Sequence, residues 1–360
     1  MQPLSGSAKT ILGAIALAAV VVSLGAFTRL VDAGLGCPDW PGCYGHVLWP
    51  DTAQEIAVAE QAFPESPVDT SKTWPEMVHR YFASALGFVI LCFALFSWRR
   101  RREPSKPLKL PLFLLLLVVV QGLFGMWTVT LKLWPQVVTA HLLGGFATLS
   151  LLWLLFLRLL HRDWQLSRVT LKGCQKVLGR VRGLALIGLV VVVLQISLGG
   201  WTTSNYAALA CADFPTCHGQ WLPELDFRQG FDLTQTIGPN YLGGVLDNQS
   251  RTAIHWSHRM GALFVCVVLL ILIRYLFALG DVSTRKLASV LLLVLVLQIG
   301  LGITNIVAVL PLAVAVAHNA IGAVLLLVLV TINYRLIRYT LPLHTTADEI
   351  IRNRDLRATT

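Results

Sequence analysis

The apolar residues of this chain gather in long blocks separated by polar segments. Each block is close to the length of about 20 residues that a helix needs to cross a bilayer. Eight blocks meet this condition: Ile11–Leu30, Met77–Trp98, Leu110–Leu131, Gln136–Leu160, Leu184–Ser204, Ala253–Leu279, Leu287–Val309 and Leu312–Ile337. The pattern predicts an all-α integral membrane protein with eight transmembrane helices.

The charged residues are few and unevenly distributed. Only 13% of the residues are charged, whereas soluble domains carry about 25%. The formal net charge of +10 could suggest a nucleic-acid partner, but most Lys and Arg lie in alternate polar segments, such as 99–102, 158–182 and 335–357. This is the positive-inside pattern of membrane proteins. It predicts that both termini are cytoplasmic, with a lipid bilayer and no nucleic acid as partner.

The sequence of the first half recurs in the second half. Four landmarks repeat in the same order at an offset of 174 to 179 residues. They are Leu24-Gly25 with Leu198-Gly199, the Cys37/Cys43 loop with the Cys211/Cys217 loop, Glu76-x-x-His79-Arg80 with His255-x-x-His258-Arg259, and Gln121-to-His141 with Gln298-to-His318. Each half has four spans, so both halves keep one orientation and form a parallel repeat.

The duplication predicts two tandem, pseudo-symmetric four-helix bundles. We expect an N-terminal half at 1–165, a cytoplasmic linker at 166–183, a C-terminal half at 184–340 and a cytoplasmic tail at 341–360. Each half also has a long outer loop after its first span, and the first loop contains a helix-like stretch at Gln54–Phe63.

Four histidines lie inside predicted spans at duplicated positions: His79, His141, His258 and His318. Ionisable residues inside a membrane are costly and therefore indicate function, although a single neutral imidazole can also serve as a hydrogen bond between helices. Each half presents two histidines from different helices at a similar depth near the outer face. Two opposed imidazoles suit a haem better than zinc, which normally takes four tetrahedral ligands.

Charged residues flank these histidines. Arg80 and Arg259 could pair with haem propionates, or extend to the interface as ordinary surface arginines. Glu76 lies one helical turn before His79 on the same face, and the second half has His255 in its place. This asymmetry favours proton-coupled chemistry in the first half and a fixed electron-transfer haem in the second. The alternative is a carboxylate that only favours the helix start.

Small residues near the histidines would allow close approach of a ring or a backbone. They are Gly87, Gly144, Gly145, Gly261 and Gly322.

The outer loops also contain two cysteine pairs, Cys37/Cys43 and Cys211/Cys217. An oxidising compartment favours structural disulfides there. A redox-active thiol pair is the alternative, and Cys37/Cys43 is the stronger candidate because its half also contains Glu76.

These motifs together resemble the haem A synthase family, over nearly the whole chain. The resemblance implies conversion of haem O to haem A, with haem O bound through His79 and His141 and Glu76 essential for turnover. It implies a permanent haem b on His258 and His318, and a bacterial inner-membrane location with the haem sites toward the periplasm. Candidate partners are haem O synthase, an electron donor in the membrane and a second copy of the chain.

Two other functional classes remain open. A two-haem cytochrome of the b type would use the same four histidines only to carry electrons, but it leaves Glu76 without a purpose. A membrane thiol oxidoreductase would use the cysteine pairs, but it does not explain the histidines.

Overall fold

The computed structural model describes residues 5–103, 108–160 and 174–338. In this part of the chain every regular element is a helix. The helices are α1 (Gly6–Leu30), α2 (Ala53–Ala62), α3 (Thr70–Arg99), α4 (Lys109–Thr130), α5 (Pro135–Leu159), α6 (Cys174–Ser204), α7 (Phe227–Gly230), α8 (Asn248–Ala278), α9 (Val282–Val307) and α10 (Leu312–Arg338).

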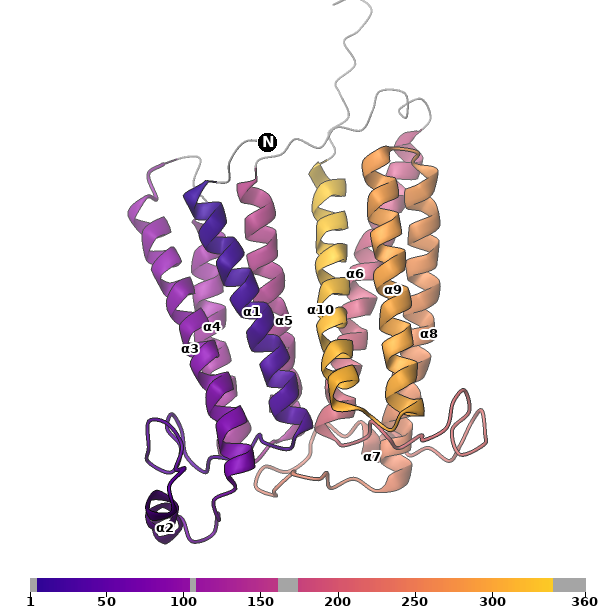
Figure 1. Cartoon of the computed structure of the whole chain (residues 1–360). Helices are drawn as coiled ribbons and strands as arrows, with labels where there is room; N and C mark the ends of the chain where they lie inside the picture. Colours follow the sequence, from indigo (N-terminus) through magenta and orange to yellow (C-terminus); the bar gives the residue numbers. More distant parts are fainter. Residues whose placement is uncertain (1–4, 104–107, 161–173, 339–360) are drawn as a thin grey trace, which may run out of the picture.

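Eight of these helices are long and apolar enough to span a membrane, which confirms the predicted fold class. They stand side by side in two groups (Figure 1). In the first group α1, α3, α4 and α5 contact one another as a ring, and α6, α8, α9 and α10 do the same in the second. This arrangement is compatible with two tandem bundles. We call the end that carries α2, α7 and the segments 31–69 and 205–247 the loop end.

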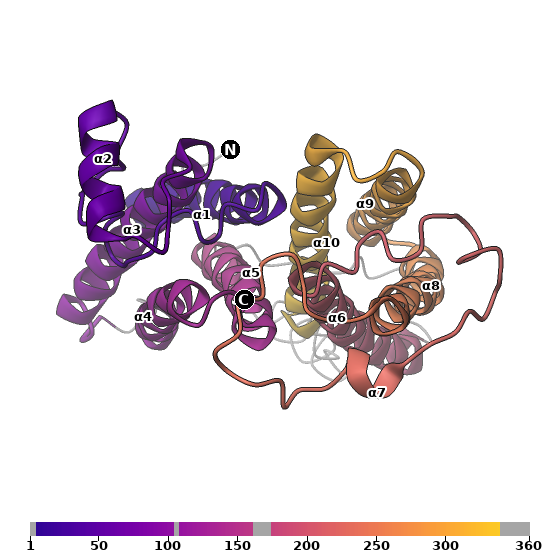
Figure 2. The ribbon, with the colours of Figure 1, turned by 90° about the horizontal axis from the view of Figure 1, so that it is seen from below.

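The two groups meet along α1, α5, α6 and α10 (Figure 2). One apolar core runs through both groups, with fully buried leucines such as Leu155 and Leu329. Polar bonds cross the contact as well: Trp153 Nε1 donates to Thr331 Oγ1 over 2.8 Å, and Arg29 Nη2 donates to the carbonyl of Thr203 over 2.7 Å.

At the loop end, two predicted spans begin too late. The helix containing His79 starts at Thr70 rather than Met77, and the helix containing His258 starts at Asn248 rather than Ala253. Both helices have a polar first turn capped by an aspartate side chain. Counting apolar residues finds the lipid-facing segment and misses this polar extension at the loop end.

The predicted linker at 166–183 also differs from the structure, because α6 already begins at Cys174. The rest of that linker and the predicted cytoplasmic tail at 341–360 lie outside the described residues. The short helix expected at Gln54–Phe63 is confirmed as α2, which begins with a capping box between Thr52 and Glu55.

The structure repeats the duplication in its turns. Asp32 and Tyr206 follow the first helix of each half with positive φ angles of 53° and 55°. The turn between α4 and α5 contains two further positive-φ residues, and the turn between α9 and α10 contains their counterparts: Lys132, Leu133, Val309 and Leu310. Equivalent sequence positions therefore adopt the same uncommon backbone conformation in both halves.

Candidate functional site

All four span histidines lie toward the loop end. They occupy the first third or so of α3, α5, α8 and α10, and each of these helices begins at the loop end (Figure 1). In each ring of four helices the two histidine-bearing helices are diagonal partners, since α3 contacts α1 and α4, and α8 contacts α6 and α9. The paired histidines therefore approach each other across the bundle interior.

His79 and His141 face each other closely. Their ring centroids are 6.4 Å apart and their planes are nearly perpendicular, at 87°. Two metal–nitrogen bonds of about 2 Å each, together with the half-widths of two rings, fill this distance. The distance therefore leaves room for one metal ion between the two rings. His258 and His318 occupy the equivalent positions on the diagonal helices α8 and α10.

Each histidine ring packs against a glycine of a neighbouring helix. A Cβ placed on Gly25 or Gly125 would lie 3.0 Å or 3.5 Å from Cε1 of the facing ring, that of His79 or His141 respectively. The second half repeats this contact: a Cβ on Gly199 would lie 3.2 Å from Cε1 of His258, and one on Gly302 would lie 3.1 Å from Cε1 of His318. In each bundle two histidines thus occupy one diagonal and two glycines the other.

The donor set fits a haem. All four rings are half-buried, and Nδ1 of His141 and of His318 is buried without a hydrogen-bond partner. Buried polar atoms without a partner indicate a ligand or water that completes the site. Across the described residues no group of three or more His, Cys, Asp or Glu side chains could hold a metal ion. Isolated pairs of imidazoles suit a metal whose other ligands come from a macrocycle.

Both cysteine pairs form disulfides, Cys37–Cys43 and Cys211–Cys217. All four cysteines are buried. An aspartate inside each loop fixes its turn: Asp39 accepts from the amides of Tyr44 and Gly45, and Asp213 accepts from those of His218 and Gly219. The Thr216 hydroxyl and these two amides hold the pKa of Asp213 well below its usual range. Each loop is therefore closed by its own disulfide and by the hydrogen bonds of its aspartate.

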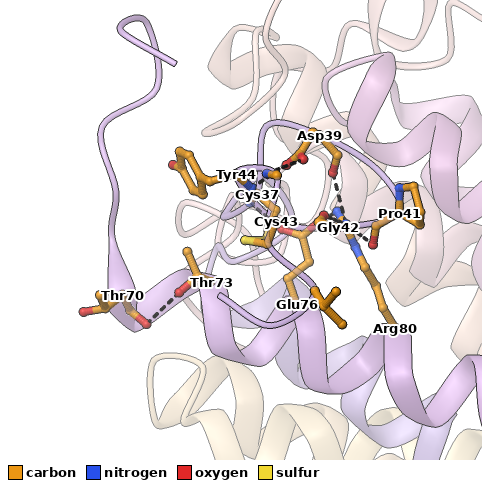
Figure 3. Close-up of a disulfide and its surroundings, with 12 residues drawn as sticks. Cys37, Asp39, Pro41, Gly42, Cys43, Tyr44, Thr70, Thr73, Glu76 and Arg80 are labelled. Carbon is orange, nitrogen blue, oxygen red and sulfur yellow. Dashed lines mark hydrogen bonds and ion pairs between the residues drawn. A yellow bond between two sulfur atoms is a disulfide. The ribbon is translucent and has the colours of Figure 1, made fainter. Parts of the chain in front are cut away.

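Arg80 and Arg259 fasten these loops to the helices. Arg80 Nη1 donates to the carbonyls of Asp39, Pro41 and Gly42, at 3.0, 3.2 and 2.6 Å (Figure 3). In the second half Arg259 donates to the carbonyls of Thr216 and Cys211, at 2.8 and 2.6 Å. The sequence suggested haem propionates as partners of both arginines; the structure gives each guanidinium a set of loop carbonyls.

Glu76 links the same loop to α3. This buried side chain accepts from the amide of Cys37 over 3.0 Å and pairs with Arg80 (Figure 3). His255 takes this position in the second half: its Nδ1 accepts from the amide of Cys211 over 3.1 Å, and its Nε2 lies 3.3 Å from Arg259 Nε. The two residues therefore have equivalent structural positions, and only Glu76 brings a carboxyl group.

Sequence reasoning missed two glutamines of the site. The Nε2 atom of Gln195 lies 3.0 Å from His258 Nδ1, and that of Gln298 lies 3.3 Å from His318 Nε2. Their signal was a Gln followed by Gly four residues later, as in Gln195-to-Gly199. Among the glycines expected near the histidines, Gly144, Gly261 and Gly322 face glutamine side chains, whereas Gly87 faces Val118 and Gly145 faces Val22.

Comparison with known proteins gives one consistent result. A family model described as cytochrome oxidase assembly protein, COX15-CtaA, matches residues 8–330. A heme A synthase of Shewanella oneidensis is 48% identical over 317 residues, which cover 88% of this chain and 92% of the relative. Heme A synthases of Sphingopyxis alaskensis and Paracoccus denitrificans are 28% and 26% identical and cover 93% and 87% of the chain.

The glycine contacts lead to a first prediction. Replacing Gly302 with Val should push the His318 ring aside and sharply lower the amount of haem that copurifies per chain. The matched control is Gly300→Val on the same helix, because a Cβ at Gly300 meets no atom within 4 Å. Haem content is measured by absorbance after extraction. Equal haem loss in both variants would mean that the ring contact is not needed.

A second prediction concerns the loop carbonyls. Replacing Arg80 with Ala removes charge-assisted hydrogen bonds worth about 1.5–3 kcal/mol each and leaves buried Glu76 without its cation. Reduction of Cys37–Cys43 by dithiothreitol should then become at least about tenfold faster, while Cys211–Cys217 keeps its rate. The rates are read by maleimide labelling and peptide mass spectrometry. Unchanged reduction of Cys37–Cys43 would show that Arg80 does not secure the loop.

Proposed function

The chain belongs to the COX15-CtaA family of cytochrome oxidase assembly proteins, and we propose that it is a haem A synthase, an oxidoreductase that converts haem O to haem A. The observation that carries this proposal is the close pairing of His79 with His141 beside a single buried carboxylate, Glu76. The relative at 48% identity, which matches over most of both chains, has this activity in its name.

The two halves have different tasks in this proposal. His79 and His141 hold the substrate haem O in the N-terminal half, and His258 and His318 hold a resident haem b in the C-terminal half. The glycine behind each ring supports both sites, and the 6.4 Å between the ring centroids of His79 and His141 supports the N-terminal site as well. The asymmetry between Glu76 and His255 supports the assignment of substrate to the N-terminal half.

In this proposal the methyl at ring position eight of haem O becomes a formyl by two hydroxylations and loss of water, a four-electron oxidation whose oxidant comes from outside the chain. A haem b held by His258 and His318 would supply electron transfer. The protein binds and orients the substrate between two imidazoles and covers the loop end of the bundle. Loop 205–247 contributes to this cover, because Trp134 Nε1 donates to the carbonyl of Gln235 and the amide of Tyr241 donates to that of Lys132.

Glu76 is the residue to which we assign proton transfer. It lies one turn from His79, it is 4% exposed, and its two oxygens already have donors in Cys37 N and Arg80. A carboxylate held in this way can accept or return a proton during oxidation of the substrate. Propionate contacts of Arg80 and Arg259 remain part of the proposal, and each guanidinium would share them with its loop carbonyls.

The proposed setting is the bacterial inner membrane, with cytoplasmic termini and the loop end toward the periplasm. Haem O synthase, a membrane electron donor and a second copy of the chain remain candidate partners. A two-haem cytochrome would use the same ring pairs, but it gives Glu76 no task beyond fastening the loop. The buried disulfides disfavour a thiol oxidoreductase, because an external thiol has no access to the sulfurs.

The exchange of Glu76 and His255 provides the decisive variants. Glu76→His should keep the loop fastened, as His255 does in the second half, and retain bound haem, but haem A formation should fall by at least about 100-fold, the scale of a lost proton-transfer group. His255→Glu is the matched control and should form haem A. The measurement is chromatography of haems extracted from cells that supply haem O.

Two results would contradict the proposal. Haem A formation at the wild-type rate by Glu76→His would remove the proton-transfer role and leave a structural one. Wild-type protein that contains haem b in both sites and never haem O or haem A would support the electron carrier instead.

A further inference from the structure

The four histidines are surrounded by a repeated pattern that is incomplete at one site. The glycine behind each ring is preceded, four residues earlier, by Gln121, Gln195 or Gln298 in three cases, and by Val21 in the case of His79. Residues four apart lie on one helix face. Each of these positions therefore lies next to the histidine that its glycine contacts.

The two glutamines of the C-terminal half reach the histidine rings. Gln195 Nε2 lies 3.0 Å from the ring nitrogen Nδ1 of His258 and donates to the backbone carbonyl of the same residue over 2.8 Å. Gln298 Nε2 lies 3.3 Å from Nε2 of His318, which is the other ring nitrogen. A side-chain amide offers both a donor and an acceptor, so it can hold the ring nitrogen that does not face a metal in either protonation state.

A glycine on each histidine-bearing helix makes room for these amides. A Cβ on Gly261 would overlap Oε1 of Gln195, and a Cβ on Gly322 would lie 3.4 Å from Nε2 of Gln298. Gly261 follows His258 by three residues, and Gly322 follows His318 by four. The histidine, the glutamine and the glycine thus form one packed unit across two helices.

At His141 the N-terminal half has the glutamine and the glycine of this unit but lacks the hydrogen bond to the ring, and at His79 it lacks all three. The amide of Gln121 occupies the space beside Gly144 of α5, and among the described residues neither the His79 ring nor the His141 ring has a side-chain hydrogen-bond partner. At His79 neither the glutamine nor the second glycine is present. Val21 takes the position of the glutamine, and Phe82 takes the position that Gly261 has in the second half.

We propose that Gln195 and Gln298 are positioning residues that lock the C-terminal histidines and make that half retain its haem, whereas the N-terminal half, without these contacts, is built to exchange haem. The inference rests on the proposed function, in which one haem is a resident cofactor and the other must enter as substrate and leave as product. Partners of metal-bound histidines of this kind typically change metal affinity by 10- to 100-fold.

The test measures haem release from one site at a time. Full-length protein carrying His79→Ala, which removes a ligand of the N-terminal site, is loaded with haem b and mixed with excess apomyoglobin, which takes up released haem. In this background Gln195→Val should release haem about tenfold faster or more. Gln121→Val, the matched control, should leave the rate unchanged, because Gln121 touches neither C-terminal histidine. An unchanged rate in Gln195→Val, or equal acceleration in both variants, would overturn the proposal.

A second comparison applies if Gln195→Val does not insert into the membrane. Gln195→Asn keeps the amide on a side chain one methylene shorter, so it should release haem faster than the chain with Gln195; an equal rate would contradict the proposal. In a His258→Ala background, Val21→Gln with Phe82→Gly should slow release from the N-terminal site, and no change there would contradict the exchange role. None of these assays requires turnover. If the release rates change as expected but the wild-type protein forms no haem A, the proposed enzymatic function is wrong and the positioning role of Gln195 is retained.

Discussion

Close contact between a histidine ring and a glycine of the neighbouring helix is the constraint on which the site depends. An imidazole in a membrane-spanning helix needs a partner or an enclosed position, and the glycine lets two helix backbones approach until the ring fills the space between them. Four such contacts fix four rings near one end of the molecule. The histidine-bearing helices are diagonal in each ring of helices, and in the N-terminal half the ring centroids of His79 and His141 lie 6.4 Å apart.

The duplicated halves share a scaffold and differ where their tasks differ. Both halves fasten a disulfide loop with an arginine and with a side chain that accepts from the first cysteine amide. The accepting side chain is Glu76 in one half and His255 in the other, so a position that serves the same structural purpose brings a carboxyl group to only one site. Hydrogen bonds to the rings show the opposite asymmetry, since Gln195 and Gln298 serve only the C-terminal pair.

Much of this architecture could be predicted from the sequence, because its main determinants are local or periodic. The eight spans follow from apolar block length, and the disulfides follow from cysteine spacing in loops placed outside by the positive-inside pattern. The pairing of His79 with His141 followed from the duplicated order of landmarks. The helix starts at Thr70 and Asn248 were missed because polar helix turns outside the bilayer leave no apolar signal.

The remaining features depend on contacts between distant segments. Arg80 is 38 residues from the carbonyl of Gly42 that it binds, and Gln195 is 63 residues from His258. No local pattern fixes such distances; only the packing of α1 on α3, and of α6 on α8, brings these groups together. The structural equivalence of Glu76 and His255 could not be predicted for the same reason. Each accepts from the backbone amide of a cysteine, and a backbone amide leaves no pattern in the sequence.

The central claim is that paired imidazoles from diagonal helices hold one haem in each half. An electron cryomicroscopy map of the full chain purified with haem tests it most directly. The account predicts one haem between His79 and His141 and a second between His258 and His318, both at the loop end of the bundles. A haem bound on the lipid-facing surface, or iron density bonded to only one histidine of either pair, would contradict it.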